Sequence, residues 1–177
     1  MARALVIGYG NPSRCDDGFG WKFTESLRQI CSTEEAEILH CHQLLPELTE
    51  AISKARVVIF VDAKANGEPG TIDVQAIKPA RENTSNTHHF APAALLALSA
   101  TLYGANPESL LVTVAGKEFG HGDELSPPVA AAMPAALGQV RNIISIVCDS
   151  AGDRVLLSSQ LVAMRRRCFR PGAHVDR

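Results

Sequence analysis

The chain has 177 residues, of which 46% are hydrophobic and 20% are charged, a balance typical of a globular protein and not of a disordered tail. A chain of this length is expected to form one domain that buries roughly 70% of the surface its unfolded form would expose. Its 17 basic and 19 acidic side chains nearly cancel, so no large single-sign field is available to bind nucleic acid or anionic lipid.

The first third of the chain predicts a strand followed by a helix. Residues 4–7 are a compact apolar run closed by Gly8-Tyr9-Gly10-Asn11-Pro12, which indicates a buried strand that ends in a tight turn. A helix is expected next, because apolar residues recur at helical spacing at Phe19, Phe23, Leu27 and Ile30. Asp16 or Asp17 can cap its first turn.

The clearest strand lies further on, at residues 57–61, after a short strand at 37–41 and a helix at 46–54. Its sequence, Val-Val-Ile-Phe-Val, is β-branched and too continuously apolar for a sheet with one wet face. We therefore place this strand in the centre of the sheet.

The second half continues the alternation. Residues 71–77 alternate like an edge strand, residues 79–87 are expected to form a loop, and residues 91–102 form a helix with Pro92 in its first turn. Another buried strand is expected at 110–115, and the last long helix runs from Pro127 to about Val147 despite Pro134. Strands that alternate with helices predict a mostly parallel sheet covered on both faces.

The tail that follows the last helix has a different composition. It carries Arg165-Arg166-Arg167 and a Pro-Gly pair without a clear core pattern. We therefore divide the chain into a domain at residues 1–148 and a peripheral basic tail at residues 149–177.

The cysteine pattern and the apolar runs exclude several classes of protein. The five cysteines are odd in number and contain no Cys-x-x-Cys pair, so neither a disulfide framework nor a structural zinc site is indicated. The longest strictly apolar runs are far shorter than the ~20 residues that span a bilayer, and no cleavage site follows the apolar start of the chain. We expect a cytoplasmic protein that is monomeric when free.

Polar residues stand at the ends of three of these predicted elements. Asp16-Asp17 follows the first strand, Asp62 ends the strand at 57–61, and His88-His89 opens the helix at 91–102. Because ligands of open α/β sheets bind outside the carboxyl ends of the strands, two carboxylates and an imidazole could converge on one crevice. Oxygen and nitrogen donors of this kind suit a divalent metal such as nickel or zinc.

Each of these residues also has a simpler interpretation. For Asp16 we prefer a capping role at the N-terminus of the following helix. Asp62 could form a turn with its own backbone, and one of His88 and His89 is expected to be an ordinary loop residue. The shared position at one edge of the sheet favours the functional interpretation.

Three other motifs are assigned no site. Gly8-Tyr9-Gly10 lacks the third glycine of a dinucleotide-binding turn, since Ser13 stands there, and the following aspartates would repel a pyrophosphate. In His40-Cys41-His42 two imidazoles share one face of a strand, a pattern more often used for packing or hydrogen bonding than for a metal. Cys15 has no positioned base in the sequence and is taken as a small filler residue.

Several motifs together resemble a known family. The segment from Gly8 to Gly20, Gly-Tyr-Gly-Asn-Pro-Ser-Arg-Cys-Asp-Asp-Gly-Phe-Gly, is similar to the N-terminal signature of the hydrogenase maturation proteases. The similarity continues in Val61-Asp62-Ala63, in His88 before an alanine- and leucine-rich helix, and in Gly122-Asp123-Glu124-Leu125-Ser126-Pro127. It covers roughly the first 145 residues in the right order. These endopeptidases trim the C-terminus of the large-subunit precursor of nickel-iron hydrogenases.

The resemblance implies a fold, a reaction and a set of site residues. The fold is a three-layer α/β/α sandwich of the phosphorylase/hydrolase-like type around a mostly parallel sheet. The activity is that of an aspartyl-type or nickel-dependent endopeptidase, and the metal-contacting and catalytic positions map to Asp17, Asp62 and His88. The family further implies that nickel arrives with the precursor and that no organic cofactor is needed.

Some features of the chain leave alternatives open. Residues His42-Gln43-Leu44-Leu45-Pro46-Glu47-Leu48 resemble the subgroup that serves bidirectional hydrogenases, while Pro12, Ser13 and Cys15 depart from the usual family residues. The same three groups could instead serve a non-catalytic nickel-sensing maturation chaperone, or another hydrolase on the same scaffold.

Overall fold

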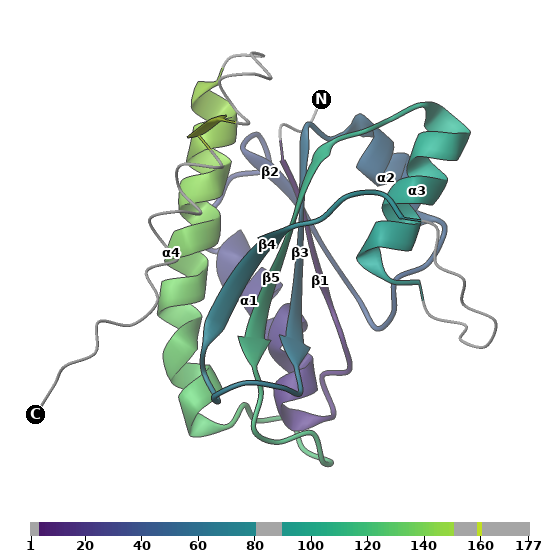
Figure 1. The fold of residues 1–177 in the computed structure, drawn as a ribbon. Helices are drawn as coiled ribbons and strands as arrows, with labels where there is room; N and C mark the ends of the chain where they lie inside the picture. The colour runs from purple at the N-terminus through teal and green to yellow at the C-terminus, as the bar shows by residue number, and fades with distance from the viewer. Residues whose placement is uncertain (1–3, 81–89, 151–158, 161–177) are drawn as a thin grey trace, which may run out of the picture.

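A computed structural model describes residues 4–80, 90–150 and 159–160 of the chain. Its centre is a sheet of five strands in the order β2-β1-β3-β5-β4 (Figure 1). The strands are β1 (Ala4–Tyr9), β2 (Ala36–Cys41), β3 (Val57–Lys64), β4 (Ile72–Ala76) and β5 (Glu108–Ala115). Four of them run parallel, and only the edge strand β4 is antiparallel to its neighbour β5.

Helices cover both faces of this sheet. The α-helices are α1 (Phe19–Arg28), α2 (Leu48–Lys54), α3 (Pro92–Tyr103) and α4 (Pro127–Asp149), and a 3-10 turn, η1 (Cys15–Gly18), precedes α1. In Figure 1, α1 and α4 lie on one side of the sheet and α2 and α3 on the other. The structure therefore confirms the predicted three-layer α/β/α architecture with a mostly parallel sheet.

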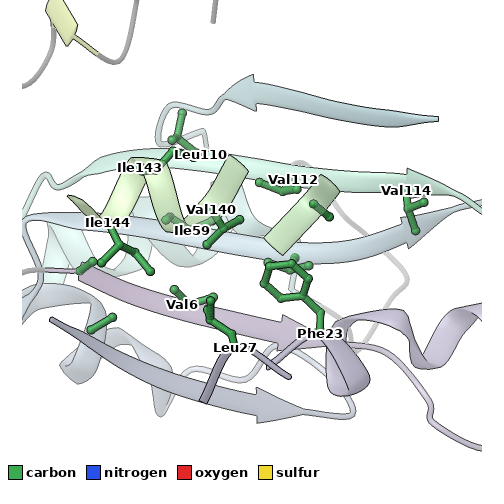
Figure 2. Close-up of a cluster of buried hydrophobic side chains, with 14 of the residues drawn as sticks. Val6, Phe23, Leu27, Ile59, Leu110, Val112, Val114, Val140, Ile143 and Ile144 are labelled. Atoms are coloured by element: carbon green, nitrogen blue, oxygen red, sulfur yellow. The ribbon is translucent and has the colours of Figure 1, made fainter. Parts of the chain in front are cut away.

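Two apolar clusters hold the layers together, because successive side chains of a buried strand point to opposite faces. On one face Val6 and Ile59 are fully buried against α1 and α4. Figure 2 shows this cluster, with Phe23 and Leu27 of α1 and Val140, Ile143 and Ile144 of α4 pointing at the strands. On the other face, strand residues such as Phe60 pack with Ile52 of α2 and Leu95 of α3.

Two glycines allow α1 to lie directly on the strands. A Cβ placed at Gly8 of β1 would collide with the backbone oxygen of Gly20 in α1, and a Cβ at Gly20 would lie 2.7 Å from the backbone oxygen of Val61. Gly8, one of the two glycines that suggested a nucleotide-binding turn, therefore serves close packing of helix on strand.

The predicted elements are found with small shifts of their ends. β3 is the central strand and β4 an edge strand, as the patterns at 57–61 and 71–77 predict. The first helix was expected to include Ile30, but α1 ends at Arg28 and Ile30 is 48% exposed. The helix expected from Pro46 begins at Leu48.

The last helix is longer than expected. α4 continues through Pro134 to Asp149, and the next residue, Ser150, is buried and accepts a hydrogen bond from Arg56 at 3.1 Å. By length and composition alone, this 23-residue helix could cross a membrane. Its most apolar face is instead buried against the sheet, as in the core helix of a globular domain.

Candidate active site

Two of the residues expected to carry the chemistry, Asp17 and Asp62, lie near the carboxyl ends of β1 and β3. The two strands pair in parallel from Ala4↔Val57 to Gly8↔Val61, so Tyr9 and Asp62 are the next residues along each strand. Asp17 lies in η1, shortly after β1 ends. This edge of the sheet is where open α/β folds bind their ligands.

Asp62 lies at this edge with few hydrogen-bond donors. Its Oδ1 accepts the N–H of Ala63 at 2.8 Å, and its carboxylate also accepts the hydroxyl of Tyr9. Burial raises the pKa of Asp62 to about 7, and the nearby charge of Asp17 adds to the increase, while the two hydrogen bonds oppose it. The Asp17 carboxylate is thus near enough to Asp62 to contribute to this increase.

Tyr9 is a site residue that the sequence did not reveal. Burial, followed by the charge and the hydrogen bond of Asp62, raises the pKa of Tyr9 well above its usual range. The hydroxyl therefore stays protonated and donates to Asp62. The signal that could have revealed Tyr9 was its position at the end of β1. Asp62 was selected from the sequence by the same kind of position, at the end of a neighbouring strand.

Asp17 is held by the turn that follows β1. Its Oδ2 accepts the N–H of Asn11 at 2.9 Å, and its own N–H donates to the carbonyl of Arg14 at 3.1 Å. Gly10 has a φ of 124°, and a Cβ there would collide with the backbone oxygen of Asp17. The glycine is therefore needed for the turn to close over Asp17.

Asp16 does not cap a helix, so the role preferred for it from the sequence is wrong. Its side chain is fully buried and reaches the loop before α4, where Oδ2 accepts the N–H groups of Lys117 and Glu118 at 2.7 and 2.8 Å. The N–H of Ser126 donates to Oδ1 at 2.7 Å, and its hydroxyl donates to Oδ2 at 2.8 Å. The cap position of α1 is taken by Gly18, without any side-chain hydrogen bond.

Hydrogen bonding also sets the ionisation of Asp16. Burial alone would raise the pKa of this carboxyl, but the donors on Glu118, Lys117 and Ser126 together lower it below its ordinary value. Asp16 is therefore a buried anion whose charge is fully matched by donors from a distant part of the chain.

Further contacts join the same two segments. The guanidinium of Arg14 donates to the carbonyl of Phe119 at 3.1 and 3.3 Å, and the N–H of Cys15 donates to the carbonyl of Gly122 at 2.7 Å. The N–H of Gly122 donates in turn to the carbonyl of Ser13 at 3.1 Å. Cys15 has a φ of 48° and its sulfur lies beside Gly122, where a Cβ would approach it to 2.8 Å.

The two histidines expected at this crevice, His88 and His89, lie outside the described residues. Within residues 4–80, 90–150 and 159–160, no group of three metal-ligating side chains is close enough to hold an ion. The described part of the site thus contains the two predicted carboxylates and a tyrosine hydroxyl, which can supply oxygen ligands and accept a proton.

The His40-Cys41-His42 motif serves packing and hydrogen bonding, as predicted. The ring of His40 stacks on Trp21 with 4.1 Å between centroids, and its Nδ1 lies 3.1 Å from the guanidinium of Arg28. The indole N–H of Trp21 donates to the carbonyl of Cys41 at 3.0 Å. These contacts attach α1 to the edge strand β2.

Known proteins share both the sequence pattern and the fold. A Methanocaldococcus jannaschii protein whose name places it among the hydrogenase maturation proteases is 26% identical over 152 residues, which are 77% of this chain and 96% of that protein. The hydrogenase-maturating endopeptidase HybD of Escherichia coli is 29% identical, with a TM-score of 0.62 over 78% of this chain and 89% of its own. The chain is thus similar in sequence and fold to the hydrogenase maturation proteases. No protein-family model matches it.

The fold of this family is also found in an archaeal structure. The nickel-iron hydrogenase maturation protease HycI of Thermococcus kodakarensis has a TM-score of 0.67 and covers 81% of this chain and 93% of its own, at 24% identity. The resemblance expected from Gly8–Gly20, Asp62 and Gly122–Pro127 is thereby confirmed at the level of the family and its fold.

Proposed function

We propose that this protein is an endopeptidase that removes the C-terminal peptide from the nickel-loaded large-subunit precursor of a nickel-iron hydrogenase. The observation that carries the proposal is the position of Asp17 and Asp62 at the carboxyl edge of the sheet, in a chain similar to the hydrogenase maturation proteases. Two carboxylates facing one space are suited to an incoming cation and to a reaction that needs a proton acceptor.

In this proposal nickel is part of the substrate, and the protein supplies ligands to it. The oxygens of Asp17 and Asp62 and the imidazole of His88 complete the coordination of the nickel that the precursor carries, which sets the register of the scissile bond. Carboxylate and imidazole donors are suited to a borderline divalent ion. The nickel can polarise the scissile carbonyl and lower the pKa of a water molecule.

The remaining steps use groups of the protein. The hydroxyl of Tyr9 donates a hydrogen bond to the carboxylate of Asp62 and so limits the rotation of the Asp62 side chain. The turn from Asn11 to Asp17 holds the second carboxylate through the N–H of Asn11. One of the two carboxylates accepts the proton of the attacking water, and the protonated group then returns it to the leaving amine.

A cleavage assay tests this function directly. The protein is incubated with nickel-loaded precursor, and with metal-free precursor as the control, and the mass of the precursor is followed. Loss of a C-terminal peptide only from the nickel-loaded form is expected. Stable binding without a change in mass would support the nickel-sensing chaperone, and cleavage regardless of nickel would support another hydrolase on this scaffold.

The partner and location follow from the same proposal. The substrate is the hydrogenase precursor in the cytoplasm, and the resemblance of residues 42–48 to one subgroup favours a bidirectional hydrogenase. The protein acts as a monomer without an organic cofactor. The basic tail expected at residues 149–177 lies outside the described residues apart from 149–150 and 159–160. We expect a chain truncated after Asp149 to keep cooperative unfolding and to lose at most a small part of its affinity for the precursor, because exposed charges are screened beyond ~8 Å at physiological ionic strength.

A further inference from the structure

The loop at residues 116–126 and the turn at residues 11–18 form one hydrogen-bonded unit. Four hydrogen bonds converge on the carboxylate of Asp16, from three backbone N–H groups and the hydroxyl of Ser126, at 2.7 to 2.8 Å. The N–H of Asp16 also donates to the carbonyl of Glu118 at 3.0 Å. Segments separated by about a hundred residues are thus joined through one side chain.

This unit extends directly to Asp17. Asp17 is the next residue in the same 3-10 turn, and its carboxylate is oriented by the N–H of Asn11 at 2.9 Å. Because Asp16 is buried and tied to the loop from both its backbone and its side chain, the turn has little freedom to shift. A change at Asp16 would be transmitted to the position of the Asp17 carboxylate, although Asp16 itself does not face the crevice.

We propose that Asp16 is a positioning residue for the peptidase reaction: it anchors the 116–126 loop to the turn after β1 and thereby holds the Asp17 carboxylate in its working position. The inference rests on the proposed function. It also gives a role to the Gly122–Pro127 motif, which takes no part in the proposed cleavage itself. Ser126 is the residue of that motif that donates twice to Asp16, and Gly122 is the residue that pairs with the turn at Ser13 and Cys15.

The first test compares steady-state cleavage of nickel-loaded precursor by the parent protein and by Asp16→Asn. The amide nitrogen of asparagine is a donor and cannot accept the hydrogen bonds that one carboxylate oxygen of Asp16 accepts. The loop therefore loses part of its anchor. Small misplacements of a catalytic group cost up to ~100-fold in rate. We expect kcat to fall by roughly tenfold to a hundredfold with a smaller change in KM, because the Asp17 carboxylate is one of several contacts to the precursor.

Glu35→Gln is the matched control. Glu35 also accepts a backbone N–H and a hydroxyl, both from Ser32, at 2.9 and 3.1 Å, but it lies just before β2 and away from the crevice. Its kcat should stay within about twofold of the parent, as expected for a partly exposed site outside the core.

A gentler pair of variants covers the case in which Asp16→Asn does not fold. Ser126→Ala removes one of the four hydrogen bonds, and Ser126→Thr keeps the hydroxyl at the same helix cap position. We expect kcat to fall about threefold in the alanine variant and to return to within about twofold of the parent in the threonine variant.

Amide hydrogen exchange tests the anchor without any substrate. In Asp16→Asn or Ser126→Ala, exchange should become faster at Lys117, Glu118 and Ser126, and also at Asn11, whose N–H reports the position of Asp17. A role confined to the loop would leave Asn11 unchanged and would overturn the proposal. Parent-like kcat in a folded Asp16→Asn would also overturn it. If the parent protein does not cleave the precursor, the proposed function fails, and the exchange at Asn11 still decides whether Asp16 positions Asp17.

Discussion

Asp16 and Asp62 are aspartates at the same edge of the sheet, and their surroundings give them opposite properties. Asp16 is fully buried and accepts four hydrogen bonds, which together hold its pKa below the ordinary value. Among the described residues, Asp62 accepts hydrogen bonds from Ala63 and Tyr9, and its burial, with a smaller contribution from the charge of Asp17, raises its pKa to about 7.

The number of hydrogen-bond donors, more than burial, accounts for the opposite pKa shifts of these two carboxylates. A buried anion that accepts four hydrogen bonds, as Asp16 does, is stabilised in place. A carboxylate with unfilled acceptor capacity keeps lone pairs for a cation or a proton, which is the condition expected at functional sites.

The largest expected effect is on cleavage, in Asp62→Asn. The amide keeps the shape of the side chain and loses the charge that a divalent ion needs, so we expect precursor cleavage to fall by at least about a hundredfold, since even outer partners of metal ligands contribute 10- to 100-fold. The measurement is the cleavage rate at equal enzyme concentration, with a thermal melt to confirm folding. Cleavage near the parent rate would remove Asp62 from the site.

A similarly large effect is expected at His88, the third nickel ligand of the proposed function. His88→Ala should stop cleavage even with excess precursor, because it removes a neutral imidazole ligand. His89→Ala should cost only about 0.5 kcal/mol of stability, as for an ordinary surface substitution. Both variants are assayed at the same concentration beside a melt. An inactive His89 variant beside an active His88 variant would reverse the assignment, and two active variants would remove histidine from the mechanism.

The third effect is on the free energy of unfolding. Here we expect the larger loss at Asp16 and the smaller change at Asp62. Asp16→Asn should lower the free energy of unfolding by about 3 kcal/mol, because hydrogen bonds to a charged group contribute about 1.5–3 kcal/mol and a buried donor is left unmatched. Asp62→Asn should change it much less at neutral pH. Urea denaturation at pH 7 measures both values. A larger loss in the Asp62 variant would contradict the contrast drawn between the two sites.

The smallest effect is on the pH dependence of stability. The pKa of Asp62 is raised on folding, so its contribution to stability is present below its unfolded pKa and is lost as the pH rises through about 7. Asp62→Asn should therefore be more stable than the parent at pH 8, by about 1–2 kcal/mol once water at the crevice screens part of the shift.

Asp16 has the opposite sign at acid pH. Its pKa is lowered on folding, so its contribution is present above the unfolded pKa of an aspartate and is lost as the pH falls below it. Melting temperatures between pH 3 and 8 for the parent and both asparagine variants measure the two dependences. Parallel curves for the parent and Asp62→Asn above pH 5 would show that Asp62 ionises normally.

Much of the fold could be predicted because it depends on local patterns. The continuous apolar run at residues 57–61 placed β3 in the centre of the sheet, and the alternation at 71–77 placed β4 at an edge. Helix ends were less certain, since Ile30 continues the apolar spacing of α1 but lies beyond its last turn, 48% exposed. Periodicity shows which residues can face a core and does not show where the chain leaves it.

The candidate site was only partly predictable, for a related reason. Asp17 and Asp62 could be selected because each follows a predicted strand, and the carboxyl ends of parallel strands share one edge. Tyr9 was missed although it ends β1, because an aromatic residue after a strand is more often part of the core. In the structure its ring packs with the α2 and α3 cluster while its hydroxyl reaches Asp62.

The amino-acid order alone was enough to indicate the layers, the central strand and the edge of the sheet at which we propose the site, since these depend on which residues are apolar and at what spacing. The role of Asp16 required the folded chain. Its acidic neighbour and the following helix favoured a capping role, while its actual partners, at Lys117, Glu118 and Ser126, are more than one hundred residues away. Hydrogen bonds between such distant segments leave no local pattern in the sequence. Only the packing of the 116–126 loop against the turn at 11–18 shows that Asp16 is a hydrogen-bonded anchor.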